Sequence, residues 1–153
     1  MQRLGLGGTA IGIEPLSPAD ANALAQGVGK AYWENARLVA NLGAQFGFRA
    51  LFYWQPALFE KTQVTPYEQS ELQTWQDYGK FFLSATRAVA EMRPATKGQP
   101  DFWNLEPLLA DVATPLYLDF AHVSEEGNDR IAHKIAADVV ASLGLSVARS
   151  RSP

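Results

Sequence analysis

Apolar residues recur at helical spacing in the first third of the chain. Between Ser17 and Phe46 they fall at the intervals expected along an α-helix and include Leu24, Val28, Ala31, Tyr32, Leu38 and Leu42. Ser17 can cap the start of this helix, with Pro18 in its first turn, and Gly47 is a natural stop. We therefore predict one long helix from Ser17 to about Phe46.

The run from Phe48 to Trp54 (FRALFYW) is short, apolar and aromatic, and it does not alternate cleanly. This pattern is typical of a strand that is buried on both faces in a parallel sheet. Gln55-Pro56 ends the run, because proline cannot donate a hydrogen bond to a neighbouring strand. A strand of this kind needs neighbours on both edges, so we expect the isolated chain to aggregate or to form oligomers.

The second half of the chain continues the alternation of helix and strand. Thr65 and Pro66 can begin a helix that runs to about Met92, and 101–105 (DFWNL) is a short strand followed by irregular chain to Pro115. A last helix runs from Ser124 to about Leu143. The order helix, strand, helix, strand, helix predicts an α/β fold around a parallel sheet.

The remaining segments lack helical or strand periodicity. Residues 1–16 are Gly-rich and are predicted to be a loop, 95–100 (ATKGQP) a turn-rich linker, and 146–153 a disordered tail. The predicted organisation is therefore a leading segment (1–16), one globular portion (17–145) and a tail.

Composition narrows the range of functions. The 153 residues are 47% hydrophobic and 19% charged, which is typical of a single globular domain. A net charge of −3 leaves no basic surplus for nucleic acid. With no cysteine and only two histidines, we expect no disulfide, no metal site and no cofactor. No apolar run approaches the roughly 18 residues of a transmembrane segment. Compartment and oligomeric state are left open.

The most informative stretch is 117–132 (YLDFAHVSEEGNDRIA), in which Asp119 precedes His122 by three residues. A carboxylate at this distance, on a turn just before a helix, can accept a hydrogen bond from Nδ1 of the imidazole. This contact fixes the tautomer and leaves Nε2 free to take a proton from a nucleophile. Alone, an Asp-x-x-His sequence strongly favours the simpler interpretation of a turn carboxylate and an ordinary helix-entry histidine.

The same stretch resembles the last conserved block of the SGNH (GDSL-type) hydrolases, a family of esterases and lipase-like enzymes. Seven positions match that block, namely Asp119, His122, Ser124, Gly127, Asn128, Ile131 and Ala132. The resemblance implies an SGNH (flavodoxin-like) three-layer α/β/α fold and a Ser-His-Asp catalytic triad that acts through an acyl-enzyme. In this chain Asp119 and His122 would supply two members of the triad.

Other parts of the family pattern are absent. The Gly-Asp-Ser block that carries the nucleophile is missing, and so are the glycine and the Gly-x-Asn that complete the oxyanion hole. All of these blocks precede the first helix in family order. We therefore expect a partial domain that retains the last parallel strands and their helices, with Met1 as an internal or truncated start, or one piece of a split domain.

Two functions are consistent with these motifs. The first is hydrolysis of a carboxylic ester of a small molecule, carbohydrate or lipid, with the serine supplied from outside this chain. The second is a catalytically inactive SGNH-like fragment or interaction module. His133 is predicted to lie on the outer face of the last helix without a functional role, and Gln55-Pro56 to be a turn that ends a strand.

Overall fold

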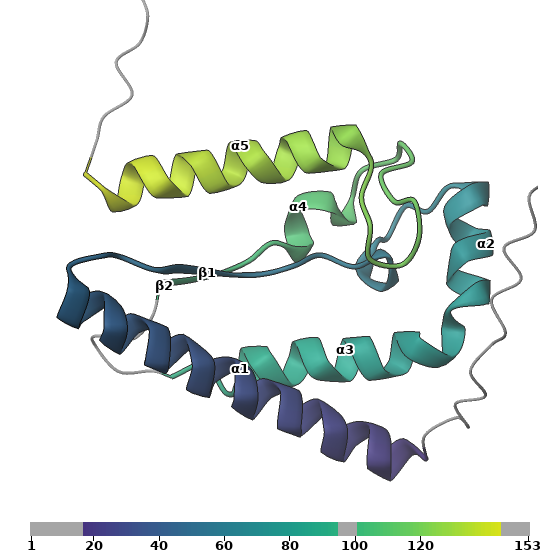
Figure 1. Ribbon diagram of the computed structural model, residues 1–153. Coiled ribbons are helices and arrows are strands. Elements are labelled where there is room, and N and C mark those ends of the chain that lie inside the picture. The colour runs from purple at the N-terminus through teal and green to yellow at the C-terminus, as the bar shows by residue number, and fades with distance from the viewer. Residues whose placement is uncertain (1–16, 95–100, 145–153) are drawn as a thin grey trace, which may run out of the picture.

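The computed structural model describes residues 17–94 and 101–144 (Figure 1). The predictions for 1–16, 95–100 and 146–153 lie outside the described residues. The elements follow in the order α1 (Pro18–Phe46), β1 (Leu51–Trp54), the 3₁₀ helix η1 (Leu58–Glu60), α2 (Pro66–Thr74), α3 (Gln76–Glu91), β2 (Asp101–Asn104), α4 (Glu106–Ala110) and α5 (Glu125–Ser142).

The first helix begins and ends where the sequence predicts. The Ser17 hydroxyl accepts a hydrogen bond from the backbone N–H of Asp20 at 3.1 Å, and Pro18 occupies the first turn. Gly47 ends the helix in the left-handed conformation, with φ of 75°, and its N–H donates to the Gly43 carbonyl. These local signals define a helix of 29 residues.

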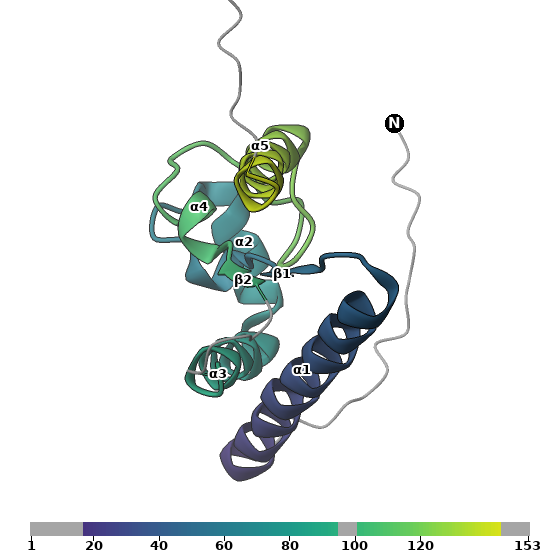
Figure 2. The same cartoon turned by 90° about the vertical axis from the view of Figure 1, so that its left-hand side faces the viewer.

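The two strands form a parallel pair in which Phe52 lies opposite Phe102 and Tyr53 opposite Trp103. Both phenylalanines face the core formed with α1 and α3, whereas the Tyr53 and Trp103 rings stack on the other face at 5.4 Å. The strands therefore do alternate, with apolar or aromatic side chains on both faces. Figure 2 shows the pair between α5 on one side and α1 with α3 on the other.

The hydrophobic core has two centres. The first joins α1, α3 and β2 through Trp33, Ala36, Val89 and Phe102. The second joins η1, α4 and the chain before α5 through Leu58, Leu109, Leu116 and Tyr117. The second centre supports the segment that carries Asp119 and His122.

The predicted fold class, a three-layer α/β/α SGNH (flavodoxin-like) domain, is wrong. Helix accounts for 66% of the structure and strand for 8%, and the one sheet of the described residues has two strands. Each strand is only four residues long, so the pair presents little area on either face. Helices α1 and α3 pack against one face through Phe52 and Phe102, and the side chains of β1 remain half-buried.

Two further differences concern the helices. The helix predicted from Pro66 to Met92 is interrupted at Trp75, where φ is −106° and ψ is 16°. The Trp75 ring packs against Phe120 at 4.6 Å, so a distant contact holds this residue out of the helix. The sequence predicts irregular chain after 105, but this segment contains α4, which begins with Glu106 and Pro107.

Candidate functional site

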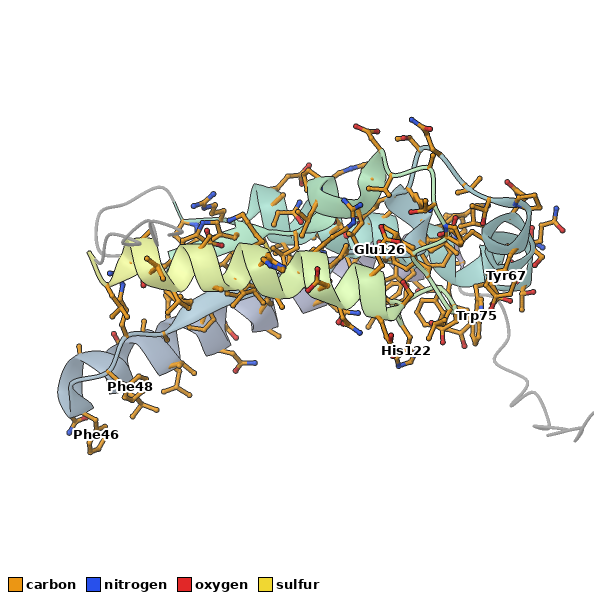
Figure 3. All side chains as sticks on the ribbon, turned by 90° about the horizontal axis from the view of Figure 1, so that it is seen from above. Phe46, Phe48, Tyr67, Trp75, His122 and Glu126 are labelled. Carbon is orange, nitrogen blue, oxygen red and sulfur yellow. The ribbon has the colours of Figure 1, made fainter. Side chains whose placement is uncertain are left out.

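Asp119 and His122 lie on the turn that leads into α5, as their spacing predicts. His122 Nδ1 is 2.7 Å from Asp119 Oδ2, while the other carboxylate oxygen accepts the backbone N–H groups of Ala121 and His122 at 2.8 Å each. The side chain of His122 is 79% exposed, and Figure 3 shows it pointing outward from the turn. Asp119 therefore occupies the Nδ1 side of the His122 imidazole, and the Nε2 side faces solvent.

Asp119 is held in its ionised form. Burial alone would raise the pKa of its carboxyl, but the two backbone N–H donors and the imidazole of His122 outweigh this effect and lower the pKa below its usual value. An ionised carboxylate favours the tautomer of His122 that carries its proton on Nδ1. Nε2 of the neutral ring is then a proton acceptor.

Aromatic packing anchors the middle of this turn. The ring of Phe120 contacts Trp75, Phe82 and Phe59, with centroid distances of 4.6, 5.1 and 5.9 Å. These partners come from the α2–α3 corner, from α3 and from η1. The residue between Asp119 and Ala121 is thus held by three different elements.

Hydrogen bonds fix the backbone of the same turn. The Leu58 N–H donates to the Phe120 carbonyl at 2.9 Å, and the Gln55 side chain donates to the Ala121 carbonyl at 2.7 Å. The sequence predicts Gln55 only as the end of a strand, but its amide also holds the turn in place. The partner of Gln55 lies 66 positions away along the chain, so the local sequence does not indicate this role.

Local geometry explains several of the positions shared with the SGNH block. Ser124 caps α5, its hydroxyl accepting from the Gly127 N–H at 3.3 Å. A Cβ on Gly127 would lie 2.9 Å from the Val123 Cβ and 3.2 Å from the Leu116 carbonyl oxygen, so glycine allows this close approach. These residues shape the turn, and their presence alone does not indicate catalysis.

A small pocket of about 170 Å³ opens beside the turn, at the carboxyl end of β1. Its walls are mostly apolar and are formed by Trp54, Gln55, Pro56, Ala57, Phe82, Thr86 and Ala121. Ala121 lines the pocket and directly precedes His122, and its N–H donates to Asp119.

A buried ion pair lies beneath the site. Lys61 Nζ is 2.6 Å from both carboxylate oxygens of Glu68, and both side chains are fully buried. The carboxylate also accepts the backbone N–H groups of Leu116 and Tyr117, at 2.9 and 3.3 Å. Sequence reasoning missed this pair, although Thr65 and Glu68 form a recognisable capping box.

Two carboxyl groups face each other next to the pocket. The carboxyl of Glu60 lies near that of Glu106 and near the hydroxyl of Thr86, which lines the pocket. Glu106 Oε1 is buried without a donor among the described residues. Burial, and next the neighbouring Glu106 carboxyl, raises the pKa of Glu60 to about 8, which favours its protonated form at neutral pH.

The Glu60 carboxyl makes stability depend on pH. Because its pKa is raised in the folded state, its contribution is fully present below the pKa of the unfolded chain and is lost as the pH rises toward about 8. We expect the free energy of unfolding to fall between pH 5 and 8 by at most about 1.4 kcal/mol per pH unit from this group. Urea unfolding of the wild type and Glu60→Gln across this range measures the effect.

The comparison isolates Glu60, because the other titrating groups, including its neighbours Glu106 and Tyr117, are present in both proteins. Glu34→Gln is the matched control, since Glu34 is an exposed carboxylate paired with Lys30 on α1. The Glu60→Gln curve should be flatter than that of the wild type, and the control curve should not. Parallel curves for Glu60→Gln and the wild type would contradict a raised pKa of Glu60.

Four serine hydroxyls of the described residues form hydrogen bonds, and none of these bonds is to His122. Ser17 and Ser124 cap helices, and the hydroxyls of Ser70 and Ser142 donate to carbonyls of their own helices. No hydrogen bond joins a described serine to His122. Within residues 17–94 and 101–144 the structure therefore brings together the two predicted site residues without a nucleophile.

His133 lies on α5 with 79% of its side chain exposed, and its Nδ1 contacts the Asp129 carbonyl at 2.8 Å. In the part of the chain that the structure describes, no three histidine or acidic side chains converge on a position where a metal could bind. None of the described helices combines the length and the apolar character needed to cross a membrane.

Comparison with known proteins gives no relatives: no protein-family model, no curated protein and no solved structure matches this chain.

Proposed function

We propose that this chain supplies the His-Asp half of a Ser-His-Asp triad in a hydrolase of carboxylic esters. The observation that carries the proposal is the 2.7 Å contact between His122 Nδ1 and Asp119 Oδ2, with the Nε2 edge of the imidazole open. This arrangement orients the ring and leaves one nitrogen for proton transfer. The resemblance of 117–132 to the last SGNH block supports the same reaction.

Each residue has a defined role in this proposal. A serine from another polypeptide segment attacks the ester carbonyl while His122 Nε2 takes the hydroxyl proton. His122 then gives that proton to the leaving alcohol, and the ionised Asp119 stabilises the imidazolium in between. Water hydrolyses the acyl-enzyme by the same exchange. The apolar pocket beside Ala121 suits one end of a small-molecule, carbohydrate or lipid ester.

A second candidate is a catalytically inactive interaction module. The observation that favours it is that no described serine hydroxyl pairs with His122. In that case the Asp119–His122 contact has only a structural role in the turn before α5. The two candidates differ in whether the His122 imidazole reacts.

Hydrolysis of p-nitrophenyl acetate by the full 153-residue chain tests whether it does. An activated ester is attacked by an accessible imidazole without a serine, so the assay needs no second polypeptide. We expect His122→Ala to lower the protein-dependent rate at least tenfold and Asp119→Asn to lower it as well, because the tautomer is no longer fixed. His133→Ala is the matched control, since both histidine side chains are 79% exposed.

Equal rates for His122→Ala and His133→Ala would make His122 an ordinary surface histidine and overturn the proposal. Fluorophosphonate labelling followed by peptide mapping then locates the nucleophile. A His122-dependent adduct on a serine of this chain would contradict a serine supplied from elsewhere. No adduct, together with His122-dependent ester hydrolysis, is the expected result.

A further inference from the structure

Helix α1 has two apolar faces, and only one of them is covered. The covered face packs along α3 and contains the buried residues Ala25, Gly29, Trp33 and Ala36, while Gly43 near the end of the helix is covered by Phe48. It is built largely from small residues, which allow the two helices to approach closely. A Cβ on Gly29 would lie only 3.0 Å from the backbone of Ala88 on α3.

The second face carries apolar residues at five of its six positions. It comprises Leu24, Val28, Ala31, Asn35, Leu38 and Leu42, which we call the outer stripe. At 3.6 residues per turn these six positions fall within an arc of about 80°. Leu24, Leu38 and Leu42 are 48%, 59% and 39% exposed, so this face is open to solvent. A surface helix face that is apolar at all but one position often marks an interaction site.

The spacing within the outer stripe identifies the kind of partner. Successive positions are separated by four, three, four, three and four residues, which is the heptad spacing of a two-stranded coiled coil. Val28, Asn35 and Leu42 then occupy the a positions, and the other three residues the d positions. None of the six is charged. A single asparagine at a central a position sets register and favours pairing with the same residue of an identical helix.

The size of the surface sets the expected strength of the contact. The outer stripe runs from Leu24 to Leu42 and is therefore roughly 27 Å long and about 10 Å wide, so it presents about 270 Å², which is near the lower end of the patch sizes that mark interaction sites. Phe46 and Phe48, which are 70% and 49% exposed, extend the apolar surface at the end of α1, away from the rest of the molecule (Figure 3). Two such faces together bury about 540 Å², roughly a third of a standard protein interface before the two phenylalanines are added, which indicates weak, reversible pairing.

We propose that two copies of this chain form a parallel homodimer by pairing α1 with α1 through the outer stripe. The position of α1 permits this arrangement, because Figure 2 shows the helix at the side of the molecule, against α3 and away from α5. Asn35 of one copy faces Asn35 of the other across the dimer axis. The proposal is independent of the ester hydrolase function, since the outer stripe and the Asp119–His122 turn lie on different elements.

Sedimentation equilibrium of the full chain tests the dimer. We expect the wild type to dimerise reversibly and Leu42→Lys to weaken the dimer at least tenfold, because it places a charge in the seam. Leu83→Lys is the matched control, since Leu83 lies on α3 and is 42% exposed, close to the 39% of Leu42. Asn35→Leu should strengthen association but make the number of chains in the assembly less well defined. Circular dichroism confirms that each variant is folded.

Cysteine crosslinking tests the orientation and does not depend on a charged variant that folds. The chain has no cysteine of its own, so Leu24→Cys and Leu42→Cys each introduce a single thiol. In a parallel dimer, diamide oxidises each variant alone to a disulfide-linked dimer. Crosslinking only in a mixture of the two variants would show an antiparallel pair and contradict the proposed orientation.

A monomer at the highest soluble concentration would overturn the proposal, as would a dimer that Leu83→Lys disrupts as strongly as Leu42→Lys. A dimer insensitive to Leu42→Lys would also overturn it and would point to the edges of β1 and β2 that have no neighbouring strand among the described residues. A monomer that loses stability in Leu42→Lys would show that another part of the same chain covers the outer stripe.

Discussion

Replacing Lys61 with methionine is expected to lower the free energy of unfolding by about 3–5 kcal/mol, because it leaves the carboxylate of Glu68 buried without its cation. Both side chains of the pair are fully buried, and Lys61 Nζ also donates to the Thr114 carbonyl at 2.7 Å. Methionine fills a similar volume but offers no donor. Urea unfolding at pH 7, followed by circular dichroism, measures the loss.

The exposed pair of Glu126 and Arg130 on α5 provides the control. Its side chains are 51% and 42% exposed, so Arg130→Met should cost no more than about 1 kcal/mol. A Lys61→Met variant that loses no more stability than Arg130→Met would show that the buried pair does not stabilise the fold.

The ion pair also links stability to the candidate site. Glu68 Oε1 accepts the N–H groups of Leu116 and Tyr117, which begin the segment leading to Asp119. We therefore expect hydrogen exchange at these two amides to accelerate in Lys61→Met.

The same pair makes stability depend on pH. Burial alone would raise the pKa of Glu68, but Lys61 and the backbone donors lower it overall, so the contribution of the pair is lost as the pH falls below about 4.5.

Features set by neighbouring residues could be predicted from the sequence. The caps formed by Ser17, Gly47 and Ser124 are present, and so is the contact between Asp119 and His122, because each depends on residues no more than four positions apart. The catalytic role of that contact stays a prediction.

Features set by distant residues could not be predicted. The order of helices and strands along the chain suggested a larger sheet. The extent of the sheet depends on contacts between helices and strands that are far apart in the sequence, and local patterns do not reveal these contacts. The pairing of Lys61 with Thr114 and that of Glu68 with Leu116 each span about fifty residues. The regular stripe of α1 likewise indicated a helix but not that α3 would pack on a different face of it.

Trp33 gives the second large effect, since Trp33→Ala should lower the free energy of unfolding by about 3–5 kcal/mol. Its side chain is buried between α1, α3 and β2, and its ring lies 5.0 Å from that of Phe102. The indole N–H donates to the Val89 carbonyl at 2.8 Å. This carbonyl belongs to the last turn of α3, where the N–H of Arg93 donates to Ala90 instead. The indole thus supplies a donor near the end of α3.

Trp33→Phe separates packing from hydrogen bonding. Phenylalanine keeps much of the buried ring but leaves the Val89 carbonyl without its indole donor, which should cost about 1–3 kcal/mol. A Trp33→Phe variant as stable as the wild type would show that the N–H group contributes nothing. Urea unfolding of these variants should be measured in a Leu42→Lys background, because pairing of α1 with a second copy would otherwise stabilise the same helix and make the measured loss depend on protein concentration.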